Sequence, residues 1–265
     1  MKVAIIGAGN MGGAVARGLA MGNRVAVSDI MVANPGRGKL EALKAEFPDM
    51  GVTSDNCLAV RDADVIILAV KPWKLCEVIE EIKGGLDYGR QVVASMAGGI
   101  GLGQLRASLD RGDGIFPAVY YLIPNTAIAV MSGMTFMASA GASPEWDACM
   151  LDMFRELGDA MLVEERQMDA GMALASCGIA YVMRYIRAAT EGGVELGLNA
   201  RDAQRTVMQT MKGAVDLLAA GGLHPEMEVD RVTTPGGLTI RGLNAMEEAG
   251  FTSSVIKGLR ASVKK

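Results

Sequence analysis

The chain opens with a strand, a glycine-rich turn and a helix in immediate succession, and this order constrains the fold more than any other feature. Residues 2–6 form a short β-branched run that ends at Gly7-Ala8-Gly9-Asn10-Met11-Gly12, and apolar residues then recur at helical spacing until Gly22. Glycines at this spacing allow a tight turn, a close approach of a pyrophosphate to the backbone, and close packing of helix on strand. The pattern predicts a dinucleotide-binding α/β fold with the phosphates at the helix N-terminus.

Strands and helices are expected to alternate up to residue 165. Strands are predicted over residues 24–28, 64–70, 91–96, 115–122 and 161–164. Helices are predicted over residues 102–109 and 144–157, the second with Ser143 as its N-cap and Pro144 in its first turn. The almost wholly apolar run at 64–70 is typical of a parallel strand covered on both faces. Residues 1–165 are therefore predicted to form an α/β dinucleotide-binding domain.

Beyond residue 166 the strand-like alternation disappears. Ala-, Met- and Leu-rich stretches predict helices over residues 168–174, 180–196, 200–220, 238–249 and 255–263. These helices carry too few charges to be solvated on every side, and their small residues and methionines suit close helix packing. Residues 166–265 are therefore predicted to form an all-α domain, whose helices suit packing against one another or against another subunit.

Composition argues against several other kinds of protein. The 26 Lys and Arg residues are spread thinly against 30 Asp and Glu residues, so no electropositive stripe for nucleic acid is expected. The four cysteines have no C-x-x-C spacing and His224 is the single histidine, so neither a disulfide framework nor a metal site is expected. This cysteine usage fits the cytoplasm. Residues 114–144 carry no charge, but prolines and glycines interrupt any helix long enough to cross a membrane.

The second predicted strand bears on the choice of coenzyme. Ser28 and Asp29 are expected at its end, and Asp29 follows Gly7 by 22 residues, where an acid accepts hydrogen bonds from the adenosine ribose of NADH. Arg37 and Lys39 follow in the same loop and would attract the 2′-phosphate of NADPH. The residues alone leave this choice open, and a plain capping role for Asp29 is an alternative.

Three further loops are expected to face one crevice. Residues 71–72, 97–99 and 124–126 each follow the end of a predicted strand. In open α/β sheets, ligands bind beyond the carboxyl ends of the strands. The three loops should therefore border the same dinucleotide site.

On these motifs the chain resembles the pyrroline-5-carboxylate reductases, which complete proline synthesis. The likeness covers almost the whole length and rests on residues 6–12, 69–72, 124–126, 242–243, 247 and 250–251. It is most specific at residues 230–240, Asp-Arg-Val-Thr-Thr-Pro-Gly-Gly-Leu-Thr-Ile. The resemblance implies a Rossmann domain followed by a helical domain that forms a homodimer, with higher assembly allowed. It favours NADPH as the coenzyme, with NADH as the alternative.

The resemblance also implies a set of site residues. The cofactor would be lined by Gly7, Gly9, Asn10, Met11, Gly12, Ser28, Asn56, Ala69, Val70, Lys71, Pro72, Ala97 and Asn125, to which the spacing argument adds Asp29. The substrate would be bound by Glu164, Ser176, Thr234, Gly236, Gly237, Leu238 and Thr239. Thr239 would lie near the ring nitrogen and is the predicted catalytic residue.

The loop at residues 234–239 suits an anion on physical grounds as well. Pro235 fixes one backbone angle, Gly236 and Gly237 permit conformations closed to other residues, and Leu238 is predicted to start a helix. Charge-assisted hydrogen bonds of about 1.5–3 kcal/mol each would hold a small carboxylate without an arginine. A helix cap that binds no ligand is the alternative.

The lack of an obvious proton donor favours an imine substrate. Carbonyl reduction creates an alkoxide that needs a proton, whereas His224 is expected in a surface or capping role. A cyclic imine arrives already protonated, and hydride delivered to its carbon neutralises the nitrogen. The protein then needs only to position two ligands and exclude water.

Some residues depart from the family pattern. Ile179 replaces a proline and Cys177 a serine in the stretch Ala-Ser-Cys-Gly-Ile-Ala-Tyr, and Tyr121 stands where an arginine is common. These differences bear on substrate choice more than on fold. Two other functions therefore stay open: a related NAD(P)-dependent imine or keto-acid reductase, and a catalytically silent nucleotide-binding homologue.

Overall fold

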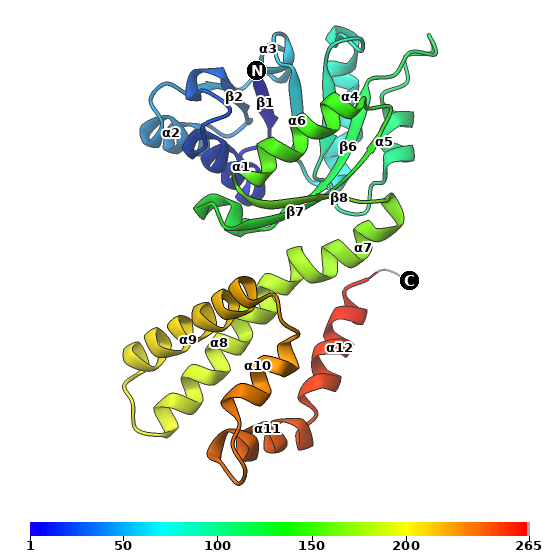
Figure 1. The fold of residues 1–265 in the computed structure, drawn as a ribbon. Coiled ribbons are helices and arrows are strands. Elements are labelled where there is room, and N and C mark those ends of the chain that lie inside the picture. The colour runs from blue at the N-terminus through cyan, green and yellow to red at the C-terminus, as the bar shows by residue number, and fades with distance from the viewer. Residues whose placement is uncertain (264–265) are drawn as a thin grey trace. The chain divides into compact units, whose positions relative to one another are not determined.

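The computed structural model describes residues 1–263, and the chain divides into two compact units, Met1–Ser176 and Cys177–Lys265 (Figure 1). The first unit is α/β and the second is helical, which confirms the predicted fold class. The predicted domain boundary at residues 165 and 166 stays a prediction.

The first unit is built on one eight-stranded sheet in the order β3-β2-β1-β4-β5-β6-β7-β8. Its strands are β1 (Val3–Ile6), β2 (Ile30–Ala33), β3 (Gly51–Thr53), β4 (Val65–Leu68), β5 (Val92–Ser95), β6 (Ala118–Ile123), β7 (Gly133–Ala140) and β8 (Gly158–Leu162). The six strands β1–β6 all pair in parallel. Strand β7 runs antiparallel to β6, and β8 runs parallel to β7. The first six strands have the Rossmann order, in which the crevice lies where the order reverses, between β1 and β4.

Helices cover both faces of this sheet. They are α1 (Asn10–Met21), α2 (Arg37–Glu46), α3 (Asn56–Val60), α4 (Pro72–Ile82), α5 (Leu102–Ser108), α6 (Pro144–Arg155) and the short α7 (Met168–Gly171). Side chains alternate along the strands, so Ile5 packs with α1, α2 and α6 while Ile6 packs with α3, α4 and α5. All four residues of β4 are fully buried, as expected for a parallel strand covered on both faces.

The prediction of a second strand at residues 24–28 is wrong. Residues 24–28 form no strand, because Val25 enters the core from a loop and Val27–Asp29 is a 3₁₀ turn. The strand is β2, whose Ile30 pairs with Val3 of β1. Ser28 and Asp29 therefore precede the second strand instead of ending it. The other predicted strands and helices of this unit are confirmed with shifted ends, whereas α2, β3, α3, α4 and β7 had no counterpart in the sequence prediction.

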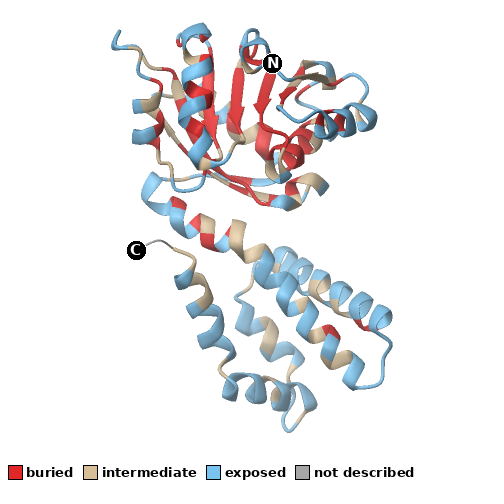
Figure 2. Ribbon diagram, turned by 180° about the vertical axis from the view of Figure 1, so that it is seen from behind, coloured by how far each residue is buried: buried red, intermediate tan, exposed pale blue. Residues whose placement is uncertain are grey.

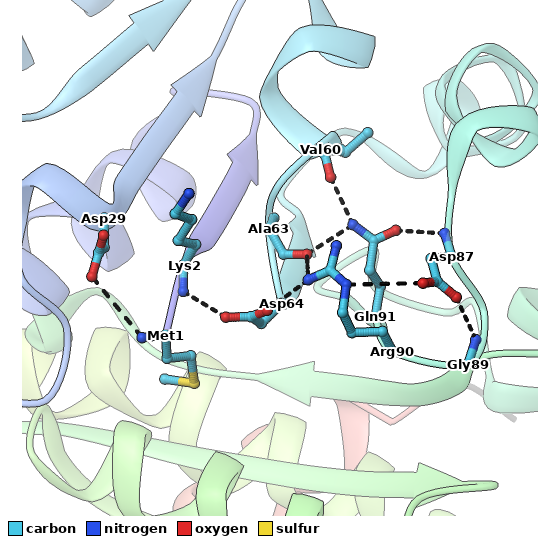
Figure 3. Close-up of polar contacts among 10 residues, drawn as sticks. All are labelled: Met1, Lys2, Asp29, Val60, Ala63, Asp64, Asp87, Gly89, Arg90 and Gln91. Carbon is cyan, nitrogen blue, oxygen red and sulfur yellow. Dashed lines mark hydrogen bonds and ion pairs between the residues drawn. The ribbon is translucent and has the colours of Figure 1, made fainter.

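A polar network lies at the amino ends of the central strands (Figure 3). Asp64 accepts hydrogen bonds from the backbone N–H of Lys2 at 2.9 Å and from the guanidinium of Arg90 at 2.7 Å. Asp29 lies at this same edge, with a carboxylate oxygen 4.0 Å from the terminal amine of Met1. Asp29 is thus at the edge of the sheet opposite to the carboxyl ends where a dinucleotide binds.

The second unit consists of α8 (Gly178–Glu195), α9 (Ala200–Gly221), α10 (Pro225–Val232), α11 (Leu238–Glu248) and α12 (Phe251–Ala261). The predicted helices are confirmed, and α10 is an additional one. His224 caps α10, because its Nδ1 accepts a hydrogen bond from the Glu226 N–H at 3.3 Å. Tyr181 links α8 to α12 by donating a hydrogen bond to the carbonyl of Gly258 at 3.3 Å. None of the described helices is long and apolar enough to span a membrane.

The helical unit leaves most of its apolar side chains exposed. Among its described residues only Thr190 and Ala203 are buried, and Figure 2 shows its helices mostly in the colour of exposed residues. Leu196 is 88% exposed and Leu238 is 85% exposed. Helices of this kind need a further surface to cover their apolar faces.

Candidate active site

The glycine turn after β1 is pressed between the neighbouring strands β2 and β4. The Gly7 N–H donates to the carbonyl of Ala33 at 2.7 Å, and the Ala69 N–H donates to the carbonyl of Ile6 at 2.8 Å. Gly7 has a φ of +106°, and a Cβ at this position would lie 2.6 Å from the carbonyl oxygen of Ala69. Glycine is therefore required at residue 7 by both conformation and space.

Gly9 and Gly12 have different roles in the turn. A Cβ on Gly12 would collide with the carbonyl oxygen of Gly7 and lie 2.8 Å from the Ala69 Cβ, so Gly12 lets α1 pack on the turn. A Cβ on Gly9 would meet nothing within 4 Å, which leaves room for a phosphate against the backbone. Helix α1 begins at Asn10 and has no side-chain cap, so its first N–H groups are free to bind an anion. These residues fit the pyrophosphate of a dinucleotide.

Asn34 follows the true second strand. Its Oδ1 accepts a hydrogen bond from the Ala8 N–H at 3.0 Å, and its Nδ2 donates to the carbonyl of Gly36 at 2.9 Å. Asn34 thus joins the glycine turn to the loop that leads into α2. A neutral amide stands where an acid was expected, and the side chains of Arg37 and Lys39 follow it, both exposed.

A cleft of about 900 Å³ opens over the carboxyl ends of β1, β2, β4 and β5. Nine predicted cofactor residues line it: Gly7, Gly9, Asn10, Met11, Asn56, Ala69, Val70, Lys71 and Pro72. Gly98 and Thr126 also line it, so the three loops that follow β4, β5 and β6 face one crevice, as predicted. The cleft brings most of the predicted cofactor residues together, and their roles as ligands stay predictions.

Three predicted cofactor residues border this cleft without lining it. Gly12 and Ala97 are buried behind it. Asn125, also buried, accepts a hydrogen bond from the Ala127 N–H at 3.1 Å and donates from Nδ2 to the carbonyl of Ala175 at 3.3 Å. Ala175 lies in a π-helical segment, Met172–Cys177, that also contains Ser176. Asn125 therefore holds the loop after β6 against the backbone beside a predicted substrate residue.

Ser28 and Asp29 do not belong with these residues. Both lie in the 3₁₀ turn before β2, and neither lines the cleft. The physical reason is the register of the second strand, which places Asn34 at the carboxyl edge in their stead. Asp29 is therefore not placed to bind an adenosine ribose.

Glu164 lies apart from the dinucleotide cleft. It is exposed and forms an ion pair with Arg166. It is also the N-cap of the 3₁₀ turn Glu165–Gln167, where it forms reciprocal hydrogen bonds with Gln167. It lines a separate open hollow of about 720 Å³ together with Arg106 of α5.

The loop at residues 234–237 forms the tight turn that its sequence predicts. The Gly237 N–H donates to the carbonyl of Thr234 at 2.9 Å, and Gly236 has a φ of +71°. Proline at the second and glycine at the third position are typical of a type II turn. Helix α11 then begins at Leu238 with Gly237 as its N-cap and no side-chain cap, and Thr239 is exposed in its first turn.

Comparisons with known proteins cover both the part of the chain that forms the dinucleotide cleft and the part that contains the turn at residues 234–237. Residues 2–98 match the family model "NADP oxidoreductase coenzyme F420-dependent", and residues 165–265 match "Pyrroline-5-carboxylate reductase dimerisation". The chain is 34% identical to pyrroline-5-carboxylate reductase 2 of Dictyostelium discoideum, over 100% of this chain and 91% of that protein. The chain belongs to the pyrroline-5-carboxylate reductase family. The predicted family is thereby confirmed.

Two further comparisons agree. Pyrroline-5-carboxylate reductase 1 of Dictyostelium discoideum is 36% identical over 99% of this chain, which spans about half of that protein, 49%. The crystal structure of Plasmodium falciparum pyrroline carboxylate reductase with NADP bound has a TM-score of 0.88 and 26% identity, and it covers 99% of this chain and 95% of its own. The predicted class of enzyme, an NAD(P)H-dependent oxidoreductase, is confirmed by this membership.

Sequence reasoning missed several residues of the cleft. These are Ile6, Asn34, Pro35, Ser54, Lys74, Glu77, Val78, Glu81 and Met96, whereas Lys39, Gly98 and Thr126 belong to loops that were predicted to border the site. For Asn34 a signal existed, because Asn34-Pro35-Gly36 is a turn sequence directly after the apolar run 30–33. Residues on α4 gave no such signal, since nothing in their local sequence indicates which face lies toward the cleft.

Replacing Gly9 and Gly12 by alanine should separate cofactor binding from stability. Gly9→Ala should keep its melting temperature, because the new Cβ meets no protein atom, but weaken NADPH binding at least about tenfold by occupying the phosphate space. Gly12→Ala should unfold more easily, by about 2 kcal/mol or more, because its Cβ collides with backbone. Fluorescence titration with NADPH and urea denaturation measure the two effects. Equal NADPH affinity of Gly9→Ala and the wild type would contradict this placement of the pyrophosphate.

Proposed function

We propose that the protein reduces 1-pyrroline-5-carboxylate to L-proline with NADPH, binding the substrate carboxylate at the turn of residues 234–237. The observation that carries this proposal is the exposed, uncapped start of α11 directly after that turn, within the sequence most specific to the family. Family membership and the dinucleotide cleft support the coenzyme part of the proposal.

The backbone of α11 supplies the donors for the carboxylate. The Gly237 N–H is already engaged with the Thr234 carbonyl, so binding falls to the N–H groups of Leu238 and Thr239, which precede the first intrahelical bonds. The Thr239 hydroxyl would orient the imine nitrogen. Gly236 shapes the turn by its positive φ, and the coenzyme when bound supplies the hydride.

Ser176 and Glu164 complete the proposed substrate set on different grounds. Ser176 is supported by its neighbour Ala175, whose carbonyl is bonded to Asn125 at the border of the cleft. Glu164 has only the resemblance as support, because it lines a different hollow. Glu164 and Ser176 belong to the same unit as the cofactor residues, whereas residues 234–239 belong to the other unit, so a shared active site is part of the proposal itself.

We infer that the chain works as a homodimer held by its helical unit. Residues 165–265 match a dimerisation domain, and the exposed apolar side chains of α8–α12 are suitable for burial against a second copy. The four free cysteines, Cys57, Cys76, Cys149 and Cys177, fit the cytoplasm, which we propose as its location. A small molecule is the substrate in this proposal, with no role for nucleic acid or a membrane.

The residues after β2 favour NADPH over NADH. Asn34 is neutral, so no carboxylate at this position repels a 2′-phosphate, and Arg37 and Lys39 supply positive charge in the first turn of α2. Asp29, which would have argued for NADH, lies before β2.

Purified protein should oxidise NADPH when 1-pyrroline-5-carboxylate is added, with L-proline as the product. The rate is followed by the absorbance of the reduced coenzyme, and the product is identified by chromatography. A panel of other cyclic imines and of keto acids is the control. Turnover of a panel member in place of 1-pyrroline-5-carboxylate would identify a related reductase, and NADPH binding without oxidation would identify a silent homologue.

The coenzyme preference should move with Asn34 and Arg37. Asn34→Asp retains the acceptor for the Ala8 N–H but adds a charge that repels the 2′-phosphate, so the ratio of kcat/KM for NADPH to that for NADH should fall at least about tenfold. Arg37→Ala should lower the same ratio. Asp29→Asn is the matched control and should leave it unchanged. A ratio that follows Asp29 instead would refute the assignment of the ribose end to Asn34.

Thr239→Val tests the proposed role of the hydroxyl. The change keeps the side-chain shape and should lower kcat/KM for 1-pyrroline-5-carboxylate at least about tenfold, without changing NADPH binding. Thr233→Val is the control, because the Thr233 hydroxyl donates to the Asp230 carbonyl at 3.2 Å and belongs to no proposed ligand contact. The role is wrong if Thr239→Val turns over and binds substrate like the wild type.

A further inference from the structure

The loop after β5 is a β-turn whose conformation is well defined. The Ile100 N–H donates to the carbonyl of Ala97 at 3.2 Å, which closes the turn. Gly99 has a φ of +82°, the value that a type II turn requires at its third residue. Gly98, at the second residue, lines the dinucleotide cleft beside Met96.

A buried tyrosine from the next strand fixes the central peptide of this turn. Tyr121, on β6, is 5% exposed, and its hydroxyl oxygen accepts a hydrogen bond from the Gly99 N–H at 3.2 Å. Tyr121 pairs in register with Ser95 of β5, whose Oγ accepts from the Ala97 N–H at 3.2 Å. Two neighbouring side chains on adjacent strands therefore hold the N–H group of the first residue of the turn and the N–H group of its central peptide.

The hydrogen bond to Tyr121 determines where the opposite carbonyl points. Type I and type II turns differ by a flip of the peptide between their second and third residues. No peptide bond in the described chain is cis, so a Gly99 N–H that points to Tyr121 directs the Gly98 carbonyl the opposite way. Gly98 lines the cleft and Tyr121 does not, so a Gly98 carbonyl that points away from the Tyr121 hydroxyl is available to a ligand on the cleft side.

The position of the turn in the sheet identifies the part of the dinucleotide that it meets. In the Rossmann order, one mononucleotide half lies over β1–β3 and the other over β4–β6. Asn34 follows β2 and belongs to the adenosine half. The turn at residues 97–100 follows β5 and belongs to the half that would hold the nicotinamide.

We infer that Tyr121 is a positioning residue for hydride transfer: its hydroxyl fixes the turn so that the Gly98 carbonyl accepts a hydrogen bond from the nicotinamide carboxamide. This inference rests on the proposed function. It is particular to this chain, because the arginine common at this position in the family has only donors and cannot accept from the Gly99 N–H. Burial raises the pKa of Tyr121, so the hydroxyl stays neutral at physiological pH.

Tyr121→Phe tests the inference, because it removes the acceptor and keeps the ring. With NADPH, kcat should fall about threefold to tenfold while KM for NADPH stays within about twofold, since the adenosine and phosphate contacts are intact. The Gly99 amide should also exchange faster with deuterium. Tyr120→Phe is the matched control: Tyr120 is also buried, and its hydroxyl donates to Asp147 of α6 at 2.9 Å. It should lower stability and leave kcat unchanged.

A coenzyme analogue separates positioning from a general loss of structure. In the acetylpyridine analogue of NADPH an acetyl group replaces the carboxamide, so it offers no N–H to the Gly98 carbonyl. Tyr121→Phe should therefore have the same kcat as the wild type with this analogue. A loss of equal size with both coenzymes, a kcat unchanged with NADPH, or an equal loss in Tyr120→Phe would overturn the inference.

Failure of the proposed function would give a different result. If the wild type does not reduce 1-pyrroline-5-carboxylate, the proposed reaction is wrong, but binding of the two coenzymes can still be measured by fluorescence. The wild type should then bind NADPH more tightly than the analogue, and Tyr121→Phe should bind both coenzymes with equal affinity.

If the wild type also binds both coenzymes with equal affinity, or if its Gly99 amide is not protected from exchange, the role of Tyr121 is refuted, whatever the reaction is. The amide measurement needs only the wild type, so it holds even where Tyr121→Phe does not fold.

Discussion

The close approach of the first glycine turn to its neighbouring strands is the constraint on which the α/β unit depends. The Gly7 N–H donates a hydrogen bond to the Ala33 carbonyl at 2.7 Å, and there is no space for a side chain at residue 7 or residue 12. The same compression aims the first N–H groups of α1 at the carboxyl edge of the sheet and brings the Asn34 amide to the Ala8 N–H. Packing and the proposed anion binding would thus have one cause, because a backbone with no Cβ atoms can approach both a strand and a phosphate.

The helical unit is less tightly packed than the α/β unit. It has a large apolar surface and only a small core of its own in which to bury it. Ordering each residue costs on the order of 1–2 kcal/mol, and burial of apolar surface is the main term that offsets it. With Thr190 and Ala203 as its only buried described residues, this unit gains little of that term from its own helices. Association with a second copy supplies the missing burial in our proposal, and the turn at residues 234–237 is carried by the same helices.

Local patterns predicted those parts of the fold that have a local cause. The turn at residues 7–12 and the turn at residues 234–237 were both recoverable, because glycine and proline restrict the backbone wherever they stand. The second strand was not, because Val25 and Val27 alternate as convincingly as Ile30 and Val32, and only pairing with β1 decides between them. That single shift places Asn34 instead of Asp29 at the carboxyl edge, and Asn34 is therefore the residue that we propose for the ribose end. The hydrogen bond between Tyr121 and Gly99 joins β6 to the turn after β5, and neither local sequence indicates it.

The sparse set of polar groups is chemically sufficient for an imine that carries its own positive charge. Burial raises the pKa of both Tyr120 and Tyr121, so neither is poised to transfer a proton near neutral pH. The substrate of the proposed reaction has a carboxylate, which needs hydrogen-bond donors, and a protonated ring nitrogen, which needs an acceptor. The start of α11 favours the anion through its N–H groups but repels the cation. In our proposal a hydroxyl in that first turn resolves the conflict, because the Thr239 oxygen would accept from the nitrogen while the backbone would donate to the carboxylate. A lysine or arginine in the same place would bind the acid and exclude the iminium.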